Sequence, residues 1–372
     1  MAKKIAIIPY ETRQGETRVA VTPQSAVSLM ALGFDVYLET DAGKQAGFND
    51  TAYRDKNIKI LPHDSRLYER ADLILQVKRP VDYKEQFILE QLHKNACIIG
   101  FLDPFLPDSQ HIHLYKKQSL TTFALEKIPK KPETELLNPL SAMSHITGKA
   151  VVNDYSQAHR LLGQKVLILG AGSLGQAAAL AARKQGAIVT IAGKSSKSKE
   201  VAQSIGCNHL QLPGSSIKEQ QDTLDHHLTQ VTTDYSLIIG AAHSRSTAAP
   251  ILLRTDTLLQ LTKLTIIYDL VATSGGNIEG VQIDATVQVG NIKIHHVSGW
   301  PKRFPQQSTE AYAGAITNFL QNLFTKTCPI TDITKSCLAS CLTHHGRQIA
   351  LTDGELLSDE LEILLKWPAD LK

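Results

Sequence analysis

The stretch KVLILGAGSLGQAAALAARKQGAIVTIAG, residues 165–193, decides the fold class. Its first part, 165–172, is a continuous apolar run that predicts a buried strand entering a glycine turn. The alanine-rich part 173–186 predicts a helix with Gly186 as its stop, and 187–193 predicts a second strand. A strand, a helix and a strand in this order predict a parallel sheet covered by helices on both faces.

The same alternation runs through most of the chain and divides it into two domains. Short apolar strands are expected at 3–10, 34–40, 72–78, 96–102, 235–242, 264–272 and 292–299, and helices at 23–33 and 308–324. The Pro-containing, charged segment 129–148 indicates a hinge, with a helix starting near Ser141. We therefore predict an α/β fold of two Rossmann-like domains with parallel sheets around a central cleft. The first domain is expected to be discontinuous, 1–138 plus 300–372, and the second to comprise 139–299.

Composition and charge exclude several classes of protein. The chain of 372 residues has 39 Lys and Arg against 36 Asp and Glu, and its net charge of +3 argues against nucleic-acid partners. Hydrophobic residues make up 42%, and no stretch approaches the roughly 20 apolar residues that cross a bilayer. The chain starts without a signal-peptide core, and its five cysteines fit a reducing compartment. We therefore expect a cytoplasmic protein without direct membrane insertion and without a disulfide scaffold.

Gly170, Gly172 and Gly175 form a GxGxxG motif where the predicted strand turns into the helix, with Ser173 and Leu174 inside the motif. This is the context in which the motif binds a dinucleotide. The first glycine permits a tight turn, the second lets the backbone approach a pyrophosphate at the helix N-terminus, and the third lets helix and strand pack closely. We expect these five residues to bind a cofactor; the alternative is a glycine-rich turn that binds nothing.

The end of the second strand carries no acidic residue. NAD-binding units usually place Asp or Glu there, about 20 residues after the glycines, to hold the ribose 2′-hydroxyl. Here Gly193 is followed by Lys194 and Ser195. A small residue followed by lysine and serine suits the 2′-phosphate of NADP(H), whereas the alternative is a solvated turn with weakened affinity for NAD. The sequence leaves both interpretations open.

Motifs along nearly the whole chain resemble those of one family. The N-terminal segment is PxExxxxExRVAxxP from Pro9 to Pro23, and it is followed by DAGKQAGFNDTAY (41–53), ADLILQVKRP (71–80) and FALEKIP (123–129). After GAGSLG come YDLVATSGGN (268–277) and GWPKRFPQQS (299–308). The chain resembles alanine dehydrogenase and the alpha subunit of proton-translocating NAD(P) transhydrogenase. The resemblance implies an oxidoreductase that binds a nicotinamide nucleotide in its second domain and forms a homodimer.

In the dehydrogenase branch of this family, the resemblance implies that Arg18 and Lys78 hold the substrate carboxylate. Arg offers a planar fork to a carboxylate and Lys a point charge. The alternative is an Arg18 that is tied to Glu16 or Glu11. Asp103 stands where that branch has its catalytic His, so a proton carrier is missing unless burial raises the pKa of Asp103.

In the transhydrogenase branch, an Arg, a Gln and an Asp contact the nicotinamide and its ribose. By position these fall on Lys130, Glu135 and Asn138, all of which differ from the family pattern. The loop over the adenosine also differs, because it is AAHSRSTAAP (241–250) here, whereas Asp269 matches a family Asp that belongs to the cofactor site. Such changes suit a member with altered cofactor or substrate use, and they also suit one that has lost activity.

The transhydrogenase branch needs no proton carrier, so it accounts best for Asp103. The chain would then be the nucleotide-binding alpha subunit, which holds NAD(H) and passes hydride to or from NADP(H) on a membrane-bound beta subunit. Catalysis would consist of positioning the two nicotinamide rings. One alternative is a stand-alone dehydrogenase that uses NADP(H) on an amino or keto acid, with Asp103 as acid and base. Another is a catalytically silent nucleotide-binding protein.

The C-terminal region contains Cys337, Cys341, His344 and His345, whose spacing is tolerable for zinc. No second pair of ligands is obvious, and HHGRQIAL resembles the terminal strand of the family. We therefore expect no metal site.

Overall fold

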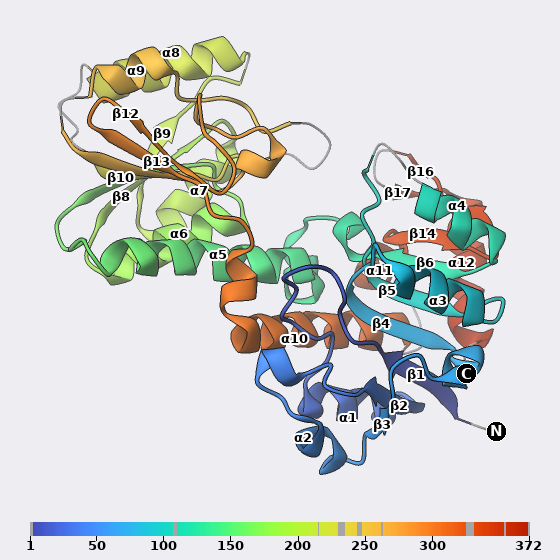
Figure 1. The fold of residues 1–372 in the computed structure, drawn as a ribbon. Helices are drawn as coiled ribbons and strands as arrows, with labels where there is room; N and C mark the ends of the chain where they lie inside the picture. The colour runs from blue at the N-terminus through green and yellow to red at the C-terminus, as the bar shows by residue number, and fades with distance from the viewer. Residues whose placement is uncertain are drawn as a thin grey trace. The chain divides into compact units, whose positions relative to one another are not determined.

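The computed structural model describes residues 3–106, 110–214, 216–229, 235–243, 248–261, 263–324, 331–352 and 355–370. The chain divides into two compact units (Figure 1). The N-terminal unit comprises Met1–Met143 and Lys302–Lys372, and the central unit comprises Ser144–Pro301. The sequence-based boundaries were 138/139 and 299/300, and those of the structure are 143/144 and 301/302.

Among the described residues of the N-terminal unit, eight strands form one sheet in the order β15-β14-β6-β5-β4-β1-β2-β3. The strands are β1 (Lys4–Ile8), β2 (Phe34–Glu39), β3 (Lys59–Leu61), β4 (Leu73–Lys78), β5 (Cys97–Phe101), β6 (Thr121–Ala124), β14 (Cys341–His344) and β15 (Arg347–Gln348). Strands β1 to β6 are parallel, whereas β14 pairs antiparallel with β6 and with β15. The C-terminal segment therefore completes a sheet that the N-terminal segment begins.

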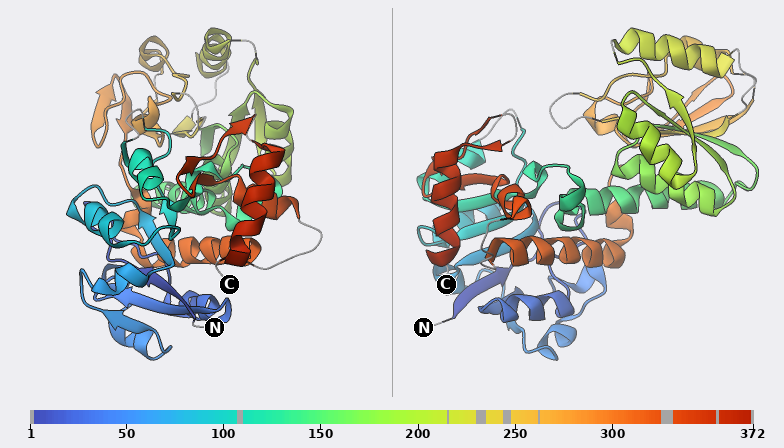
Figure 2. Two further views of the ribbon diagram at one scale, coloured as in Figure 1. Left: turned by 90° about the vertical axis from the view of Figure 1, so that its right-hand side faces the viewer. Right: turned by 180° about the vertical axis from the view of Figure 1, so that it is seen from behind.

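The helices of the N-terminal unit cover both faces of this sheet. They are α1 (Pro23–Ala31), α2 (Asp50–Arg54), α3 (Tyr83–Gln91), α4 (Gln110–Lys117), α10 (Pro305–Phe324), α11 (Asp332–Leu338) and α12 (Ser358–Asp370). Apolar residues of α3 and α4 pack with Ile5, Ile7 and Ile74, while the rings of α10 contact Phe101 and Phe123. Figure 2 shows α10 along the sheet and the C-terminal strands and α12 in the same unit.

Among the described residues of the central unit, seven strands form a second sheet in the order β12-β13-β11-β10-β7-β8-β9. The strands are β7 (Lys165–Leu169), β8 (Ile188–Gly193), β9 (Asn208–Gln211), β10 (Tyr235–Gly240), β11 (Thr265–Asp269), β12 (Thr286–Val289) and β13 (Ile292–His295). All pairs are parallel except β12 with β13. The helices are α5 (Pro139–Ser156), which begins in the N-terminal unit, α6 (Ser173–Lys184), α7 (Ser196–Ile205), α8 (Ile217–Thr229) and α9 (Thr255–Leu259).

These elements confirm the α/β class with two Rossmann-like, mostly parallel sheets. In both units two parallel strands lie on one side of the first strand and three on the other, which is the doubly wound order 3-2-1-4-5-6. A two-stranded ribbon of β16 (Leu351–Thr352) and β17 (Glu355–Leu356) lies outside both sheets. Within the described residues, none of the helices has both the length and the apolar character that a membrane span requires.

Candidate functional site

The glycine turn of the central unit connects β7 to α6. Gly170 has φ of +106°, and a Cβ atom there would lie 2.9 Å from the Cα atom of Ala242. A Cβ atom at Gly175 would lie 2.0 Å from the carbonyl oxygen of Gly170. Both positions therefore require glycine, the first for its backbone conformation and the second because helix and strand are in contact.

Gly172 differs from the other two glycines because its surroundings are open. It caps α6 with φ of −72°, which any residue adopts, and no heavy atom lies within 4 Å of where its Cβ atom would be. Ser173 and Leu174 form the first turn of α6 and are half-buried. The free backbone N–H groups of a helix start attract phosphate, so the open side of Gly172 suits a pyrophosphate.

The turn stands at the switch point of the sheet, where strand order reverses between β7 and β10. The N–H of Ala241, just after β10, donates to the carbonyl oxygen of Leu169 at 2.9 Å, so the two strand ends are joined. In open α/β sheets, ligands bind in the crevice beyond the carboxyl ends of the strands at this point. The predicted cofactor-binding glycines therefore have the surroundings that a dinucleotide site needs.

Asp269 shapes a neighbouring loop from the end of β11. Its carboxylate is fully buried and accepts hydrogen bonds from the N–H groups of Val271, Asn277 and Ile278, at 3.0, 2.6 and 2.9 Å. Burial raises the pKa of Asp269, and these three hydrogen bonds oppose the shift. A Cβ atom at Gly276 would lie 2.9 Å from the same carboxylate. Asp269 therefore shapes the site through the loop that it holds.

Asn277 connects that loop to the segment after β10. Its side chain accepts from the N–H of Ala242 at 2.8 Å and donates to the carbonyl oxygens of Ala242 and Pro250, each at 2.9 Å. The residue is fully buried. Sequence reasoning did not single it out, although it ends the YDLVATSGGN motif. Within the AAHSRSTAAP segment, residues 244–247 lie outside the described part of the chain.

The end of β8 places the predicted Gly193, Lys194 and Ser195 at the start of α7. Gly193 is the last residue of β8, and Ser195 caps α7 by accepting from the N–H of Ser198 at 3.2 Å. Lys194 is exposed to solvent. These positions follow the strand next to β7, as the sequence predicted for residues near an adenosine ribose.

Arg18 in the N-terminal unit is buried and paired with Glu16. Its Nε and Nη2 atoms donate to the two carboxylate oxygens of Glu16, both at 2.6 Å. Burial alone would raise the pKa of Glu16, but the Arg18 guanidinium holds it below its ordinary value. Arg18 is therefore paired with Glu16, and two donors of its planar fork are already engaged.

Lys78 ends β4 at the switch point of the N-terminal sheet. A bulge after Leu75 redirects the end of this strand, and the N–H groups of Val77 and Lys78 donate to the Glu11 carboxylate at 2.6 and 3.1 Å. Among the described residues, the Lys78 ammonium has no hydrogen-bond or ion-pair partner, and burial lowers its pKa. The sequence placed Glu11 in the N-terminal motif and offered it as a partner for Arg18, but it did not indicate that burial raises the pKa of Glu11 to about 8.

Asp103 follows β5 with φ of +54°. Its Oδ2 atom accepts from Nη1 of Arg13 at 2.6 Å and lies 3.7 Å from Nη2 of Arg79. Its N–H donates to Glu126, whose pKa is raised to about 7 by burial. The carboxylate is therefore paired with the Arg13 guanidinium and has the Arg79 guanidinium nearby.

The three residues predicted for the nicotinamide loop have different environments. Lys130 is exposed, Glu135 is half-buried within a short 3₁₀ helix, and Asn138 is fully buried. The Asn138 side chain accepts from the N–H groups of Leu140 and Ser141 at 3.0 and 3.3 Å. Its oxygen therefore satisfies the free N–H groups at the start of α5.

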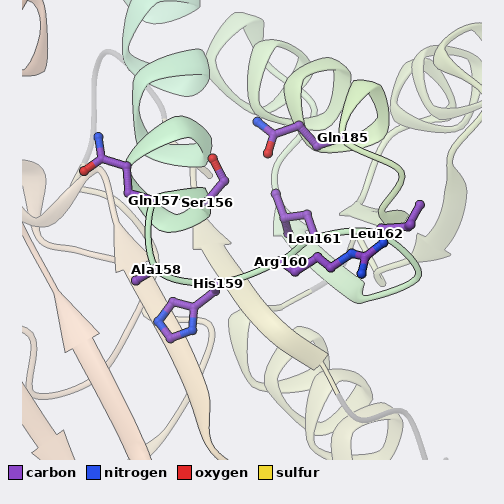
Figure 3. Close-up of a pocket in the computed structure, with 8 residues that line it drawn as sticks. All are labelled: Ser156, Gln157, Ala158, His159, Arg160, Leu161, Leu162 and Gln185. Carbon is purple, nitrogen blue, oxygen red and sulfur yellow. The ribbon is translucent and has the colours of Figure 1, made fainter.

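A surface hollow of about 490 Å³ in the central unit is separate from these residues (Figure 3). It is lined by Ser156, Gln157, Ala158, His159, Arg160, Leu161, Leu162 and Gln185. Residues 156–162 precede β7, and Gln185 follows α6. The hollow therefore lies at the opposite end of the sheet from the glycine turn. None of the predicted site residues lines it. Over the described ranges, no cluster of three or more His, Cys, Asp or Glu is arranged to hold a metal ion.

Known families and solved structures match this chain over most of its length. A family model described as alanine dehydrogenase/PNT, N-terminal domain, matches residues 7–147, and one described as the C-terminal domain of the same family matches residues 157–351. An NAD(P) transhydrogenase subunit alpha from Haemophilus influenzae is 28% identical over 347 residues, which is 85% of this chain. The chain spans 65% of the length of that relative.

Two solved structures have the same fold. A transhydrogenase from Sinorhizobium meliloti superposes with a TM-score of 0.78 at 24% identity, over 93% of this chain and 98% of that one. An L-alanine dehydrogenase superposes with a TM-score of 0.75 at 21% identity, over 99% of this chain and all of that one. At these identities the superpositions establish the fold alone, and the transhydrogenase and the alanine dehydrogenase have this fold in common.

Proposed function

Because the chain belongs to the alanine dehydrogenase/PNT family, we propose that its central unit binds a nicotinamide dinucleotide for hydride transfer. The observation that carries the proposal is the glycine turn at the β7/β10 switch point. Gly170 and Gly175 are required by the fold, whereas Gly172 is open toward the place where a pyrophosphate would lie. The fold explains why glycine is needed at positions 170 and 175, and a bound pyrophosphate would explain the open side of Gly172.

Within the family, the site favours the role of a transhydrogenase alpha subunit. Hydride transfer between two nicotinamide rings needs no general acid or base in this chain, only close and correct placement of the rings. Oxidation of an amino acid needs a proton carrier near the reacting carbon. By the resemblance Asp103 stands at the position of that carrier, and its carboxylate is already engaged by Arg13, with Arg79 nearby.

The partners follow from this role. The second nucleotide would be held by a membrane-bound beta subunit, and the chain would lie on the cytoplasmic side of that membrane as a homodimer. The resemblance implies NAD(H) on this chain and NADP(H) on the partner, whereas Gly193, Lys194 and Ser195 suit NADP(H) on this chain. Either arrangement supplies the two different nucleotides that such an exchange requires.

The direct test is nucleotide binding to Gly172→Ala, measured by calorimetry with NADH and with NADPH. The added methyl group fits the chain but stands where the pyrophosphate would approach the backbone. We expect binding to weaken at least about tenfold with an unchanged melting temperature. Gly314→Ala is the matched control, since Gly314 is an exposed residue of α10 with open space around its Cα atom. Unchanged binding in Gly172→Ala would contradict the proposed site.

A stand-alone dehydrogenase acting on an amino or keto acid is the second candidate. The observation that favours it is Lys78, a half-buried ammonium at the switch point of the N-terminal sheet without an ion-pair partner among the described residues. The chain alone, supplied with nucleotide and amino or 2-keto acids, distinguishes the candidates. Turnover abolished by Lys78→Gln would favour the dehydrogenase, and absence of turnover with intact nucleotide binding would favour the subunit. A silent homologue would bind nucleotide and transfer no hydride even with the partner present.

A further inference from the structure

The end of β8 excludes the acidic residue that usually selects NAD. A Cβ atom at Gly193 would lie 2.5 Å from the Cβ atom and 2.6 Å from the Oγ atom of Ser198, closer than the 3.0 Å that real Cβ contacts respect. Any side chain at this position would displace the first turn of α7. A side chain at position 193 therefore requires Ser198 to move, and replacing Gly193 alone does not accommodate a carboxylate there.

Side chains from the edge strand β9 organise the same place. The Ser198 hydroxyl donates to the carbonyl oxygen of Ser195 and lies 2.9 Å from Nε2 of His209. Since a hydroxyl has one proton, Nε2 of His209 acts as the donor in the second contact. Gln211 donates to the carbonyl oxygen of Lys194 at 3.1 Å. Lys194 and Ser195 are thus hydrogen-bonded to Gln211 of β9 and Ser198 of α7, and the imidazole of His209 lies near Gly193.

The charged side chains of residues 193–199 are all positive, and the next charged residue, Glu200, is an exposed acid in the second turn of α7. Lys194, Lys197 and Lys199 are exposed, and residues 193–199 contain no acidic side chain. The first turn of α7 is likewise free of acidic residues. Ser195 and Ser196 add hydroxyl groups at the start of the helix. A phosphate dianion is stabilised by cations and by hydrogen-bond donors, and this segment offers both.

We propose that the end of β8 binds the 2′-phosphate of NADP(H), with Lys194 and Ser195 as the residues that select it and His209 as a positioning residue that holds Ser198. The inference rests on the proposed nucleotide binding and names the nucleotide. If the chain works with a partner subunit, that partner then supplies NAD(H), the reverse of the arrangement implied by the resemblance. Because the ribose 2′-position lies far from the nicotinamide ring in a dinucleotide, these residues select the nucleotide without taking part in hydride transfer.

Calorimetry with NADPH and NADH at equal salt tests the proposal. We expect NADPH to bind at least tenfold more tightly than NADH. Equal or tighter binding of NADH would overturn this inference and leave the proposed function standing, because a nucleotide still binds. Binding of neither nucleotide would overturn both. Adenosine 2′,5′-bisphosphate should bind more tightly than adenosine 5′-phosphate, which assigns the preference to the 2′-phosphate.

Single substitutions separate selection from a structural role. Lys194→Gln should weaken NADPH binding about tenfold and leave NADH binding unchanged. Lys184→Gln is the matched control, because Lys184 is an exposed lysine at the far end of α6 from the glycine turn. It should change neither affinity. An equal loss for both nucleotides in Lys194→Gln would show that Lys194 does not select the 2′-phosphate and would overturn that assignment.

A double substitution should reverse the preference. Gly193→Asp combined with Ser198→Gly removes the blocking side chain and adds the carboxylate that would accept from a ribose 2′-hydroxyl. We expect this variant to bind NADH more tightly and NADPH at least tenfold more weakly than the wild-type chain. Gly193→Asp alone should lower the melting temperature, because Ser198 then has no space. A correctly folded double variant that still prefers NADPH would overturn the proposal.

Discussion

The two units share one strand order but use it differently at the switch point. In the central unit, the chain leaves β7 through Gly170–Gly172 and enters α6 at once. In the N-terminal unit, it leaves β1 through residues 9–22, a long segment that carries Glu11, Glu16 and Arg18 into the interior. The first arrangement leaves the turn open at Gly172, where we propose that a ligand binds, and the second fills the corresponding place with charged side chains.

The second strand of each sheet sharpens this contrast. β8 ends at Gly193, whose missing side chain leaves room for Ser198, whereas β2 ends at Glu39. Glu39 is the acidic residue that a nucleotide-binding unit would have at this position, but it is fully buried and accepts from Lys84 and Tyr68. An acid that is fully buried and paired inside the fold is not exposed to a ribose. Equal topology therefore does not imply equal binding, since the side chains at the strand ends decide it.

The largest expected effect concerns Glu39. Its Oε1 atom accepts from the Lys84 ammonium at 2.5 Å and from the Tyr68 hydroxyl at 2.9 Å, and its Oε2 atom accepts from the N–H of Tyr10 at 2.7 Å. Lys84→Met should lower the free energy of unfolding by about 3–5 kcal/mol, because it leaves a buried carboxylate without its cation. Denaturant unfolding measures this loss.

The matched control for Lys84 is Lys3→Met. Lys3 pairs with Asp35 at 3.7 Å on the surface, where both side chains are largely solvated. This change should cost less than about 1 kcal/mol, because solvent screens such a pair. Similar losses in the two variants would show that the interior of the N-terminal unit does not depend on the Glu39 pair.

The second effect is a pH dependence that originates in the N-terminal unit. Burial raises the pKa of Glu11 to about 8, above its ordinary value of 4.5, so the folded chain binds a proton that the unfolded chain releases. This contribution to stability is complete below pH 4.5 and is lost as the pH rises through about 8. The slope approaches about 1.4 kcal/mol per pH unit within that window.

Glu11→Gln tests this slope because a glutamine does not titrate. Unfolding in denaturant between pH 5 and 9 should show stability that falls with rising pH in the wild-type chain and a flatter profile in the variant. Glu126, whose pKa is raised to about 7 by burial, leaves a residual slope of the same sign. An unchanged slope in Glu11→Gln would mean that the buried carboxyl stays ionised.

The third effect distinguishes two glycines of the same turn. Gly175→Ala should destabilise the central unit by about 1–3 kcal/mol, because the new methyl group meets the Gly170 carbonyl oxygen. Gly172→Ala should leave stability within about 0.5 kcal/mol and weaken nucleotide binding instead. Thermal unfolding and calorimetry on both variants give the two results. If Gly172→Ala loses stability as Gly175→Ala does, the turn is a packing feature only.

The smallest effect belongs to Asp103. Asp103→Asn keeps the left-handed backbone, which Asn tolerates, and removes the charge that faces Arg13. Because this pair is partly exposed, we expect a loss of only about 0.5–1 kcal/mol and unchanged nucleotide binding. Thermal unfolding measures the loss. A change in nucleotide affinity would assign Asp103 a role beyond the ion pair.

Apolar strands were predictable from sequence, and polar or short ones were not. β7, β10 and β11 are continuous apolar runs, so burial on both faces is visible in the residues themselves. β9, with the sequence NHLQ, is largely exposed at the sheet edge and has no apolar pattern to detect. β14 pairs with a strand more than two hundred residues earlier, a partner that no local pattern specifies.

The candidate site likewise contains residues that were predictable from sequence and residues that were not. The spacing of Gly170, Gly172 and Gly175 was sufficient to predict the turn, because a short backbone feature depends on neighbouring residues only. Ser198 and His209 were not predictable, since their relation to Gly193 arises where a helix and an edge strand meet.

The sequence by itself determined the α/β class, the family and the glycine turn. These depend on local apolar runs and on the short-range geometry of glycine, which the order of residues contains. Only the tertiary structure showed that Arg18 pairs with Glu16 and that Glu39 pairs with Lys84. It also decided that Gly193 has no space for a side chain. Burial and pairing come from segments distant along the chain, and they set which charges remain for a ligand.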